Sequence, residues 1–409
     1  MQPQHTTPQP LPARPLDGMR VLELGQLLAG PFAGSMLAYF GAEVIKVEPV
    51  GKGDPLRVWR LLDDHATSFW WHSLGRNKTC VTLNLHTDKG RQIARQLVNR
   101  VDVLIENFRP GTMEKWGLGP QEVKATNPRL IYARVSGYGQ SGPYASRPGF
   151  ASVCEGIGGF RYVNGFPGGA PVRPNLSLGD TLAGLHAVLG ILLAYIHRQK
   201  PAQPPGQVVD VAIYEAVFNM LEAIVPEYDG AGVVRQPSGS TLTGIVPTNT
   251  YVCRDGKYVI IGGNGDSIFR RLMHAAGRPD MAEDPRLADN AGRVVNEAEI
   301  DAAISAWTST MDAAAVLAAL EAAAVPAGPI YSVADMLQDA HFQARGLFEE
   351  VSVDGKALKI PAMVPQLSAT PGRTDWPGPA IGAHNQAVYG KLLGFSDAEL
   401  ASLRQEGVI

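Results

Sequence analysis

Short apolar runs alternate with segments of helical spacing at the start of the chain. Residues 19–24, MRVLEL, form a short apolar run typical of a strand, and residues 43–48, EVIKVE, predict a second strand. Between them, residues 31–42 carry apolar side chains at helical spacing. Pro31 stands at the expected helix start, where its missing N–H costs nothing. This order predicts a β-α-β unit.

The alternation continues with a predicted helix over 90–100 and predicted strands over 101–106 and 128–136. A chain that alternates in this way is typical of a doubly wound α/β domain. A further apolar run covers residues 181–196. Sixteen residues that include His186 are too few to span a bilayer, so we expect a buried core helix and no membrane partner.

The pattern changes after a proline-rich break at residues 198–207. Residues 208–225 begin like a strand and continue as a helix. Residues 249–263 predict a hairpin with its turn at Asp255 and Gly256. Three helical segments follow, at 268–277, 299–309 and 311–324. Residues 226–332 therefore predict a smaller α+β domain.

The last residues of the chain predict a helix that begins at a capping box. Ser396 is a good N-cap, and Glu399 follows it by three positions.

Composition narrows the class of protein. Of the 409 residues, 18% are charged and 45% are apolar, which is typical of a globular chain. The net charge of −3 and the lack of a basic stripe argue against a nucleic-acid partner. The three cysteines lie far apart without a CxxC pair, so we expect a reduced, cytoplasmic protein. Residues 1–16 lack the apolar core of a signal peptide and are interpreted as a disordered tail.

Two loops that follow predicted strands are candidate ligand sites. The first contains Gly25, Gly30 and Gly34, a spacing too long for the tight pyrophosphate turn of nicotinamide enzymes. Binding of a different nucleotide-like ligand at the strand ends stays an open alternative. The second loop is ENFRPG at 106–111, whose Asn107 and backbone amides suit a phosphate or an adenine, although an ordinary turn fits equally well.

The nine histidines show neither HxH nor HExxH spacing, so a metal site is not expected. No GxSxG motif is present, which argues against an ordinary α/β-hydrolase.

Asp180 is the only acidic residue between 171 and 196, and it follows Gly179 at the start of the long apolar run. It has two interpretations. It is either a helix N-cap or a nucleophile kept ionised by the helix end. Small residues after it, such as Ala183 and Gly184, would let another backbone or a ligand approach.

Six segments together resemble the class III CoA-transferases, the family that includes formyl-CoA transferase and carnitine CoA-transferases. The likeness covers nearly the whole chain from Leu16, with the motifs in the order and at the spacings of the family. The segments are 16–57, 75–85 (GRNKTCVTLNL), 101–111 (VDVLIENFRPG), 136–143 (SGYGQSGP), 178–198 (LGDTLAGLHAVLGILLAYIHR) and 394–409.

The resemblance implies that Asp180 attacks the donor thioester, giving an acyl-aspartyl anhydride and then an aspartyl-CoA thioester. The chemistry needs neither a metal nor a redox cofactor, and coenzyme A enters only as part of the substrates. The CoA contacts implied by the family, with the basic groups facing the phosphates, are Leu27, Ala29, Leu83, Asn107, Phe108, Arg109 and Lys115.

The resemblance also implies a fold and an assembly. Family members form interlocked homodimers, with a large Rossmann-like domain made from both chain ends and a small middle domain. For this chain we expect a tail over 1–16, a large domain over 17–205, a small domain over 226–332, and a return to the large domain over 340–409.

Two departures from the family pattern leave alternatives open. Ala151 stands where some members carry an acid, so the role of that acid is either lost here or moved to another residue, for instance Glu155. The loop at 238–244 is short for one that shields a reaction intermediate. An α-methylacyl-CoA racemase is one alternative, but it would need an acid/base histidine near Phe150. A catalytically inactive CoA-binding protein is the other.

The segments 244–263 and 171–174 look most like the branch that moves CoA from succinyl-CoA to C5 dicarboxylates such as itaconate, glutarate or citramalate. A dicarboxylate has a second carboxylate that needs a cation, and Arg offers a bidentate match. Arg147, Arg161 and Arg173 lie close to Asp180 in the sequence. Arg173, seven residues before Asp180, is either the partner of that carboxylate or a solvated loop charge. We expect Arg147, Arg173 and Phe150 to contact the substrate.

Overall fold

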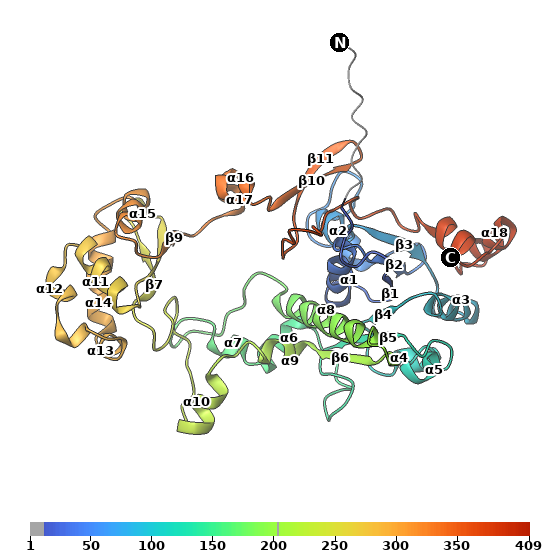
Figure 1. The fold of residues 1–409 in the computed structure, drawn as a ribbon, viewed down its shortest axis with the longest axis horizontal. Helices are drawn as coiled ribbons and strands as arrows, with labels where there is room; N and C mark the ends of the chain where they lie inside the picture. The colour runs from blue at the N-terminus through green and yellow to red at the C-terminus, as the bar shows by residue number, and fades with distance from the viewer. Residues whose placement is uncertain (1–11, 203) are drawn as a thin grey trace, which may run out of the picture. The chain divides into compact units, whose positions relative to one another are not determined.

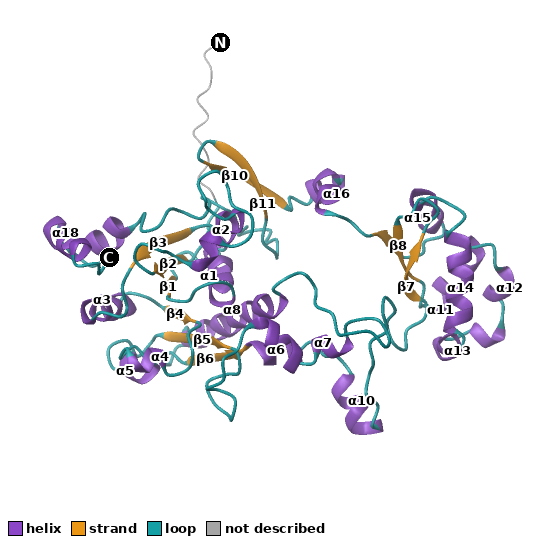
Figure 2. Cartoon of the chain, turned by 180° about the vertical axis from the view of Figure 1, so that it is seen from behind, coloured by secondary structure: helices purple, strands orange, loops and turns teal. Residues whose placement is uncertain are grey.

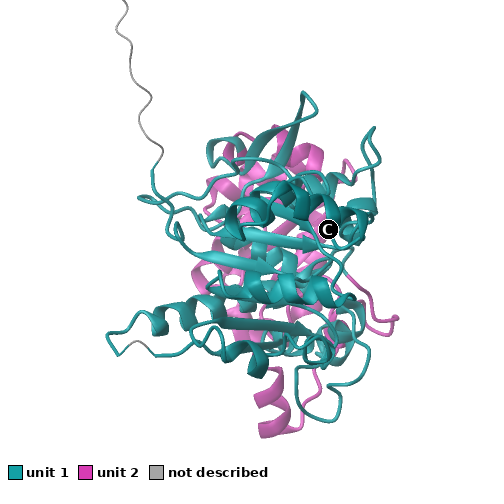
Figure 3. Ribbon diagram, turned by 90° about the vertical axis from the view of Figure 1, so that its right-hand side faces the viewer, with its two compact units in different colours: residues 1–160, 174–221, 343–409 teal, residues 161–173, 222–342 magenta. Residues whose placement is uncertain are grey.

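The chain forms two compact units in a computed structural model that describes residues 12–202 and 204–409 (Figure 3). Three stretches make up the larger unit, namely the residues up to 160, 174–221 and 343–409. The smaller unit contains residues 161–173 and 222–342. It is therefore wider than the expected middle domain at 226–332, and it takes residues 161–173 out of the expected large domain.

The larger unit is built on one parallel sheet of six strands. Their order across the sheet is β3-β2-β1-β4-β5-β6. The strands are β1 (Arg20–Glu23), β2 (Glu43–Glu48), β3 (Lys78–Thr82), β4 (Val103–Glu106), β5 (Ile131–Ser136) and β6 (Val208–Ala212). The order reverses between β1 and β4, and open sheets of this type bind ligands outside the strand ends at such a point. The expected α/β class is confirmed.

Alternate side chains of the buried strands pack into two separate cores. Val21 and Val103 pack with α1 (Ala29–Tyr39) and α8 (Leu178–Arg198) on one face. The residues that alternate with them along the strands, Leu22 and Leu104, pack on the other face with α3 (Asp88–Val98), α5 (Pro120–Lys124) and α18 (Asp397–Gln405). Figure 1 shows α8 running along β5 and β6.

Shorter elements complete the larger unit. They are η1 (Pro55–Val58), α2 (Phe69–Leu74), α4 (Thr112–Lys115), α6 (Ala151–Ile157), α9 (Ile213–Phe218), β10 (Phe348–Val353), β11 (Lys356–Pro361) and the π-helical segment η3 (Gln386–Leu392). The last residues return to the sheet, where the backbone N–H of Asn84 donates to the Val408 carbonyl at 2.8 Å. The capping box of Ser396 and Glu399 is confirmed at the start of α18.

The smaller unit has a three-stranded antiparallel sheet covered by helices (Figure 2). The predicted hairpin is confirmed, and Gly256 in its turn has φ of 75°. The elements are α10 (Ile224–Ala231), β7 (Thr248–Val252), β8 (Tyr258–Gly262), α11 (Asp266–Ala275), α12 (Pro279–Ala282), η2 (Pro285–Leu287), α13 (Asn290–Val295), α14 (Glu297–Thr308), α15 (Ala313–Ala322), β9 (Ala327–Pro329) and α16 (Val333–Gln338). Two helices, α7 (Phe160–Val163) and α17 (Ala340–Ala344), lie at the unit boundaries.

Three expectations need correction. Helix α1 begins at Ala29, two residues before Pro31. The helix expected over 181–196 is the 21-residue α8, which is long and apolar enough to cross a membrane by length and composition alone. Of the expected tail, residues 1–11 lie outside the described residues, whereas Arg14 is held by an ion pair of 2.8 Å to Asp375.

Candidate active site

A hollow of about 210 Å³ lies at the carboxyl ends of β1, β2 and β3 and beside the segment after β4. Its wall is partly aromatic, because Trp116 meets Phe108 and His86 edge to face, with ring centres 5.1 and 5.7 Å apart. The hollow thus occupies the point where the strand order reverses. Its lining includes Leu24, Val47, Leu83, His86, Phe108 and Trp116.

The loop after β1 is held in an unusual conformation beside this hollow. Leu27 has φ of 65°, in the left-handed region that few residues other than glycine adopt. The Asp54 carboxylate accepts the N–H of Leu27 at 3.1 Å, and Asn107 bonds the backbone of Gln26. A Cβ on Gly25 would lie 2.6 Å from the Asn107 Oδ1, so this close approach requires glycine.

Fully buried charged side chains hold the loop after β1 in place. The Lys46 ammonium lies 2.9 Å from Glu23 and 2.8 Å from Asp54, and it also donates to the Gly25 carbonyl. Lys78 pairs with Glu23 and donates to the carbonyl of Pro31. Burial alone would raise the pKa of Glu23, but the two ammonium groups outweigh it and hold that pKa below its usual value. Both ends of the loop are therefore tied to paired, buried charges.

Phe108 is positioned by a further buried acid, Glu106. Its N–H donates to Glu106 Oε2 at 2.8 Å, and the Arg134 guanidinium donates to Glu106 Oε1 at 2.7 Å. Burial raises the pKa of Glu106 to about 7 despite the opposing effect of Arg134.

The residues expected to contact CoA lie around this hollow and its loop. Leu83 and Phe108 line it, and Leu27 and Ala29 belong to the loop and the start of α1. Arg109 and Lys115 are exposed on the segment that carries Phe108, whereas the Asn107 amide is engaged by Gln26. Sequence reasoning missed Trp116 and Asp54, because only the tertiary contacts give them a place in the site.

Asp180 is the third residue of α8, and Ser177 is the N-cap. The interpretation of Asp180 as an N-cap is therefore wrong. A carboxylate in the first turn still lies at the positive end of the helix dipole, which favours its ionised form. Its side chain is half-buried.

The first turn of α8 rests on helix α6. The N–H of Gly179 donates to Glu155 Oε1 at 3.2 Å, and Glu155 is fully buried. Burial raises the pKa of the Cys154 thiol to about 11, and the charges of Asp180 and Glu155 add to this effect. Two carboxylates and a protonated thiol are thus gathered at one helix start.

Helix α8 also touches the start of α1. A Cβ on Gly184 would lie 2.9 Å from the carbonyl oxygen of Ala29, so the two helices approach as closely as glycine allows. Residues four apart lie on one face of a helix. Asp180 is therefore on the face of α8 that meets the end of the first loop.

The residues expected to contact the substrate belong to different units of the chain, Arg147 and Phe150 to the larger one and Arg173 to the smaller one. The Arg147 guanidinium stacks over the Tyr144 ring, 3.7 Å from its centre, and Phe150 is 67% exposed just before α6. Ala151 is buried against Gly179. Arg173 lies in the smaller unit, in an exposed segment without regular structure.

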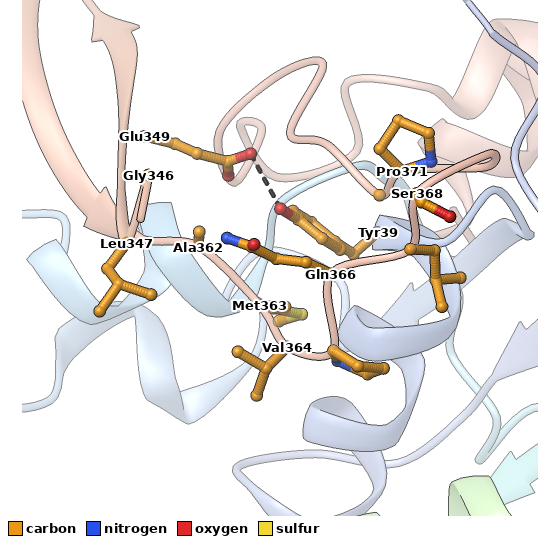
Figure 4. A pocket seen from close by; sticks show the side chains of 13 residues that line it. Tyr39, Gly346, Leu347, Glu349, Ala362, Met363, Val364, Gln366, Ser368 and Pro371 are labelled. Carbon is orange, nitrogen blue, oxygen red and sulfur yellow. Dashed lines mark hydrogen bonds between the residues drawn. The ribbon is translucent and has the colours of Figure 1, made fainter. Parts of the chain in front are cut away.

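A larger hollow of about 490 Å³ lies where Tyr39 ends α1, at the opposite end of that helix from Ala29 (Figure 4). The Tyr39 hydroxyl donates to Glu349 Oε1 at 3.1 Å. Burial, followed by the charge of Glu349, raises the pKa of this phenol to about 12. The lining comes mainly from residues 346–372 and includes none of the expected site residues. Over the described ranges, no group of three or more His, Cys, Asp or Glu could hold a metal ion.

Comparison with known proteins relates this geometry to a family. The model of CoA-transferase family III matches residues 16–385. A succinyl-CoA–D-citramalate CoA-transferase of Chloroflexus aurantiacus is 47% identical over 399 residues, which cover 97% of this chain and 99% of that protein. A succinyl-CoA–L-malate CoA-transferase beta subunit of the same organism is 40% identical over 97% of this chain and 98% of its own length. The crystal structure of a CAIB/BAIF family protein from Brucella suis, 33% identical, superimposes with a TM-score of 0.82 over 93% of this chain and 100% of that one.

Proposed function

This chain belongs to CoA-transferase family III, and on that premise we propose that it moves CoA from succinyl-CoA to a short dicarboxylate. The similarity to the D-citramalate and L-malate transferases supports the choice of donor and acceptor class. Citramalate, itaconate and glutarate are the C5 acceptors to test first. The observation that carries the proposal is the position of Asp180, in the first turn of a helix packed against the end of the loop after β1.

The reaction needs only carboxylate and thiolate chemistry. The Asp180 carboxylate attacks the succinyl thioester, a C–O bond forms, and the C–S bond breaks to release CoA thiolate. The thiolate then attacks the aspartyl carbonyl of the anhydride, so that succinate leaves and an aspartyl-CoA thioester remains. The acceptor carboxylate displaces the thiolate to form a second anhydride. The returning thiolate attacks the acceptor carbonyl and restores the Asp180 carboxylate.

The hollow at the strand ends suits the nucleotide part of CoA. Its aromatic wall of Phe108 and Trp116 offers flat apolar surface to an adenine ring. Arg109 and Lys115 are exposed on the same segment, in a position to meet phosphate groups. The thioester would then reach Asp180 past the Leu27 loop.

Incubation with succinyl-CoA and a panel of carboxylates, read by mass spectrometry, tests this function. We expect a new acyl-CoA and an equal amount of succinate with at least one of D-citramalate, itaconate, glutarate or L-malate. Absence of any new acyl-CoA across the panel would reject the proposal. Racemisation of a 2-methylacyl-CoA without exchange of CoA would instead support the racemase alternative.

We also propose a homodimer, on the basis of the family resemblance. Helix α8 carries exposed apolar side chains at helical spacing, Leu185, Leu189 and Leu193, which a second chain would cover. Light scattering at micromolar concentration should give twice the mass of one chain, and a monomer mass would contradict the proposal.

A further inference from the structure

Helix α8 begins without a side-chain cap of its own. The first backbone N–H groups of any helix lack partners within the helix, and the N-cap residue usually supplies one. Ser177 occupies the N-cap position, but its side chain makes no capping bond. The acceptor for Gly179, the second residue of α8, comes instead from Glu155 on α6.

The first turn of α8 packs closely against α6 and the start of α9. A Cβ on Gly179 would lie 3.2 Å from Ile213, 3.3 Å from Glu155 and 3.4 Å from Ala151. Glu155 is 0% exposed, so its carboxylate cannot exchange this bond for one to bulk water. A buried acceptor of this kind fixes the backbone that donates to it.

We propose that Glu155 is a positioning residue for the nucleophile. It holds the N–H of Gly179, and the next residue along the chain is Asp180. By fixing the first turn of α8, it fixes the point from which the Asp180 carboxylate attacks the thioester. Glu155 itself does not touch the substrate. This inference rests on the proposed function.

Three variants separate positioning from simple stability. Glu155→Ala removes the acceptor. Glu155→Asp keeps the charge but withdraws the oxygen by one methylene, and Glu155→Gln keeps an oxygen acceptor in place without the charge. A misplacement of about 1 Å costs on the order of 100-fold in rate. We therefore expect kcat to fall about 10- to 100-fold in the Ala and Asp variants, with the KM for succinyl-CoA nearly unchanged.

The Gln variant provides the rescue, and we expect its kcat to stay within about 5-fold of the parent, because a side-chain oxygen still accepts from Gly179. Glu215→Ala on the neighbouring helix α9 is the matched control, since Glu215 is exposed and its removal should leave kcat unchanged. Thermal unfolding of each variant shows whether it folds. If the Ala variant does not fold, the Asp and Gln pair decides.

The outcomes distinguish this inference from the proposed function. A parent protein that transfers CoA, together with Ala and Asp variants of unchanged kcat, would overturn only the role of Glu155. Equal losses in the Gln and Asp variants would also overturn it, because the N–H acceptor would then not be the cause. A parent protein that transfers no CoA to any carboxylate would reject the function itself.

Discussion

The side chain of Asn107 bonds both polar groups of the Gln26 backbone. Its Oδ1 accepts the N–H at 2.8 Å, and its Nδ2 donates to the carbonyl oxygen at 2.8 Å. Gln26 follows β1 and Asn107 follows β4, so one amide ties together the two loops where the strand order reverses. The loop that approaches the hollow is thus held by a side chain from the neighbouring strand.

Loss of this amide should weaken CoA binding. Asn107→Ala removes both bonds that hold the loop at Gln26, so CoA must order on binding a loop that the parent already holds, at a cost of about 1–3 kcal/mol. We expect the Kd for CoA, measured by calorimetry, to rise about 10- to 100-fold. Asn127 is the matched control, because its Nδ2 bonds the carbonyls of Val98 and Val101 away from the hollow. Asn127→Ala should lower stability and leave the Kd unchanged, whereas an equal rise in both variants would contradict the role of Asn107.

The buried Glu106 should make the stability of the fold depend on pH. Its pKa is raised to about 7, whereas an unfolded glutamate titrates near about 4.3. Between these values the folded chain holds a proton that the unfolded chain has lost, so the stability from Glu106 is present at low pH and disappears as pH rises through 7. Glu106→Gln cannot titrate. From pH 5 to pH 8 the parent should lose about 2–3 kcal/mol relative to this variant in denaturant unfolding. Parallel pH profiles would show that Glu106 does not titrate in this range.

Arg173 is expected to hold the far carboxylate of a dicarboxylate acceptor. Arg173→Gln should then weaken kcat/KM for dicarboxylates by roughly 2–3 kcal/mol, the scale of a charge-assisted hydrogen bond. A monocarboxylate of similar length should lose far less. Arg147→Gln tests the second expected contact, and because that guanidinium already stacks on Tyr144 we expect a smaller loss than for Arg173→Gln. Equal losses for both types of acceptor would remove the residue-level support for dicarboxylate recognition.

Local patterns predicted the sheet better than they predicted the site. The strand over Glu43–Glu48 was expected at these bounds, because its apolar residues are all β-branched and the segment stands between a glycine and a proline. The start of α1 was misplaced because the first N–H groups of a helix have no partner within the helix, so proline is tolerated at its third position as well as its first. An aspartate is likewise favoured both at the N-cap and in the first turn of a helix, so its position in the sequence made Asp180 look like an N-cap.

Long-range contacts explain what sequence reasoning could not find. The helix expected to continue to residue 225 ends at Phe218, and α10 begins at Ile224, although the apolar spacing runs through the break. The bond from Gly179 to Glu155 joins residues 24 positions apart and depends on how α6 packs on α8. No periodicity in the sequence encodes such a contact.

The most direct test is to trap the acylated side chain of Asp180. The parent protein and Asp180→Ala are each incubated with succinyl-CoA, treated with hydroxylamine and digested for peptide mass spectrometry. We predict a hydroxamate at Asp180 of the parent that requires succinyl-CoA, and an Ala variant that folds and binds CoA but transfers none. Substantial turnover by the Ala variant, or a hydroxamate on a different carboxylate, would contradict the assignment of Asp180 as the nucleophile.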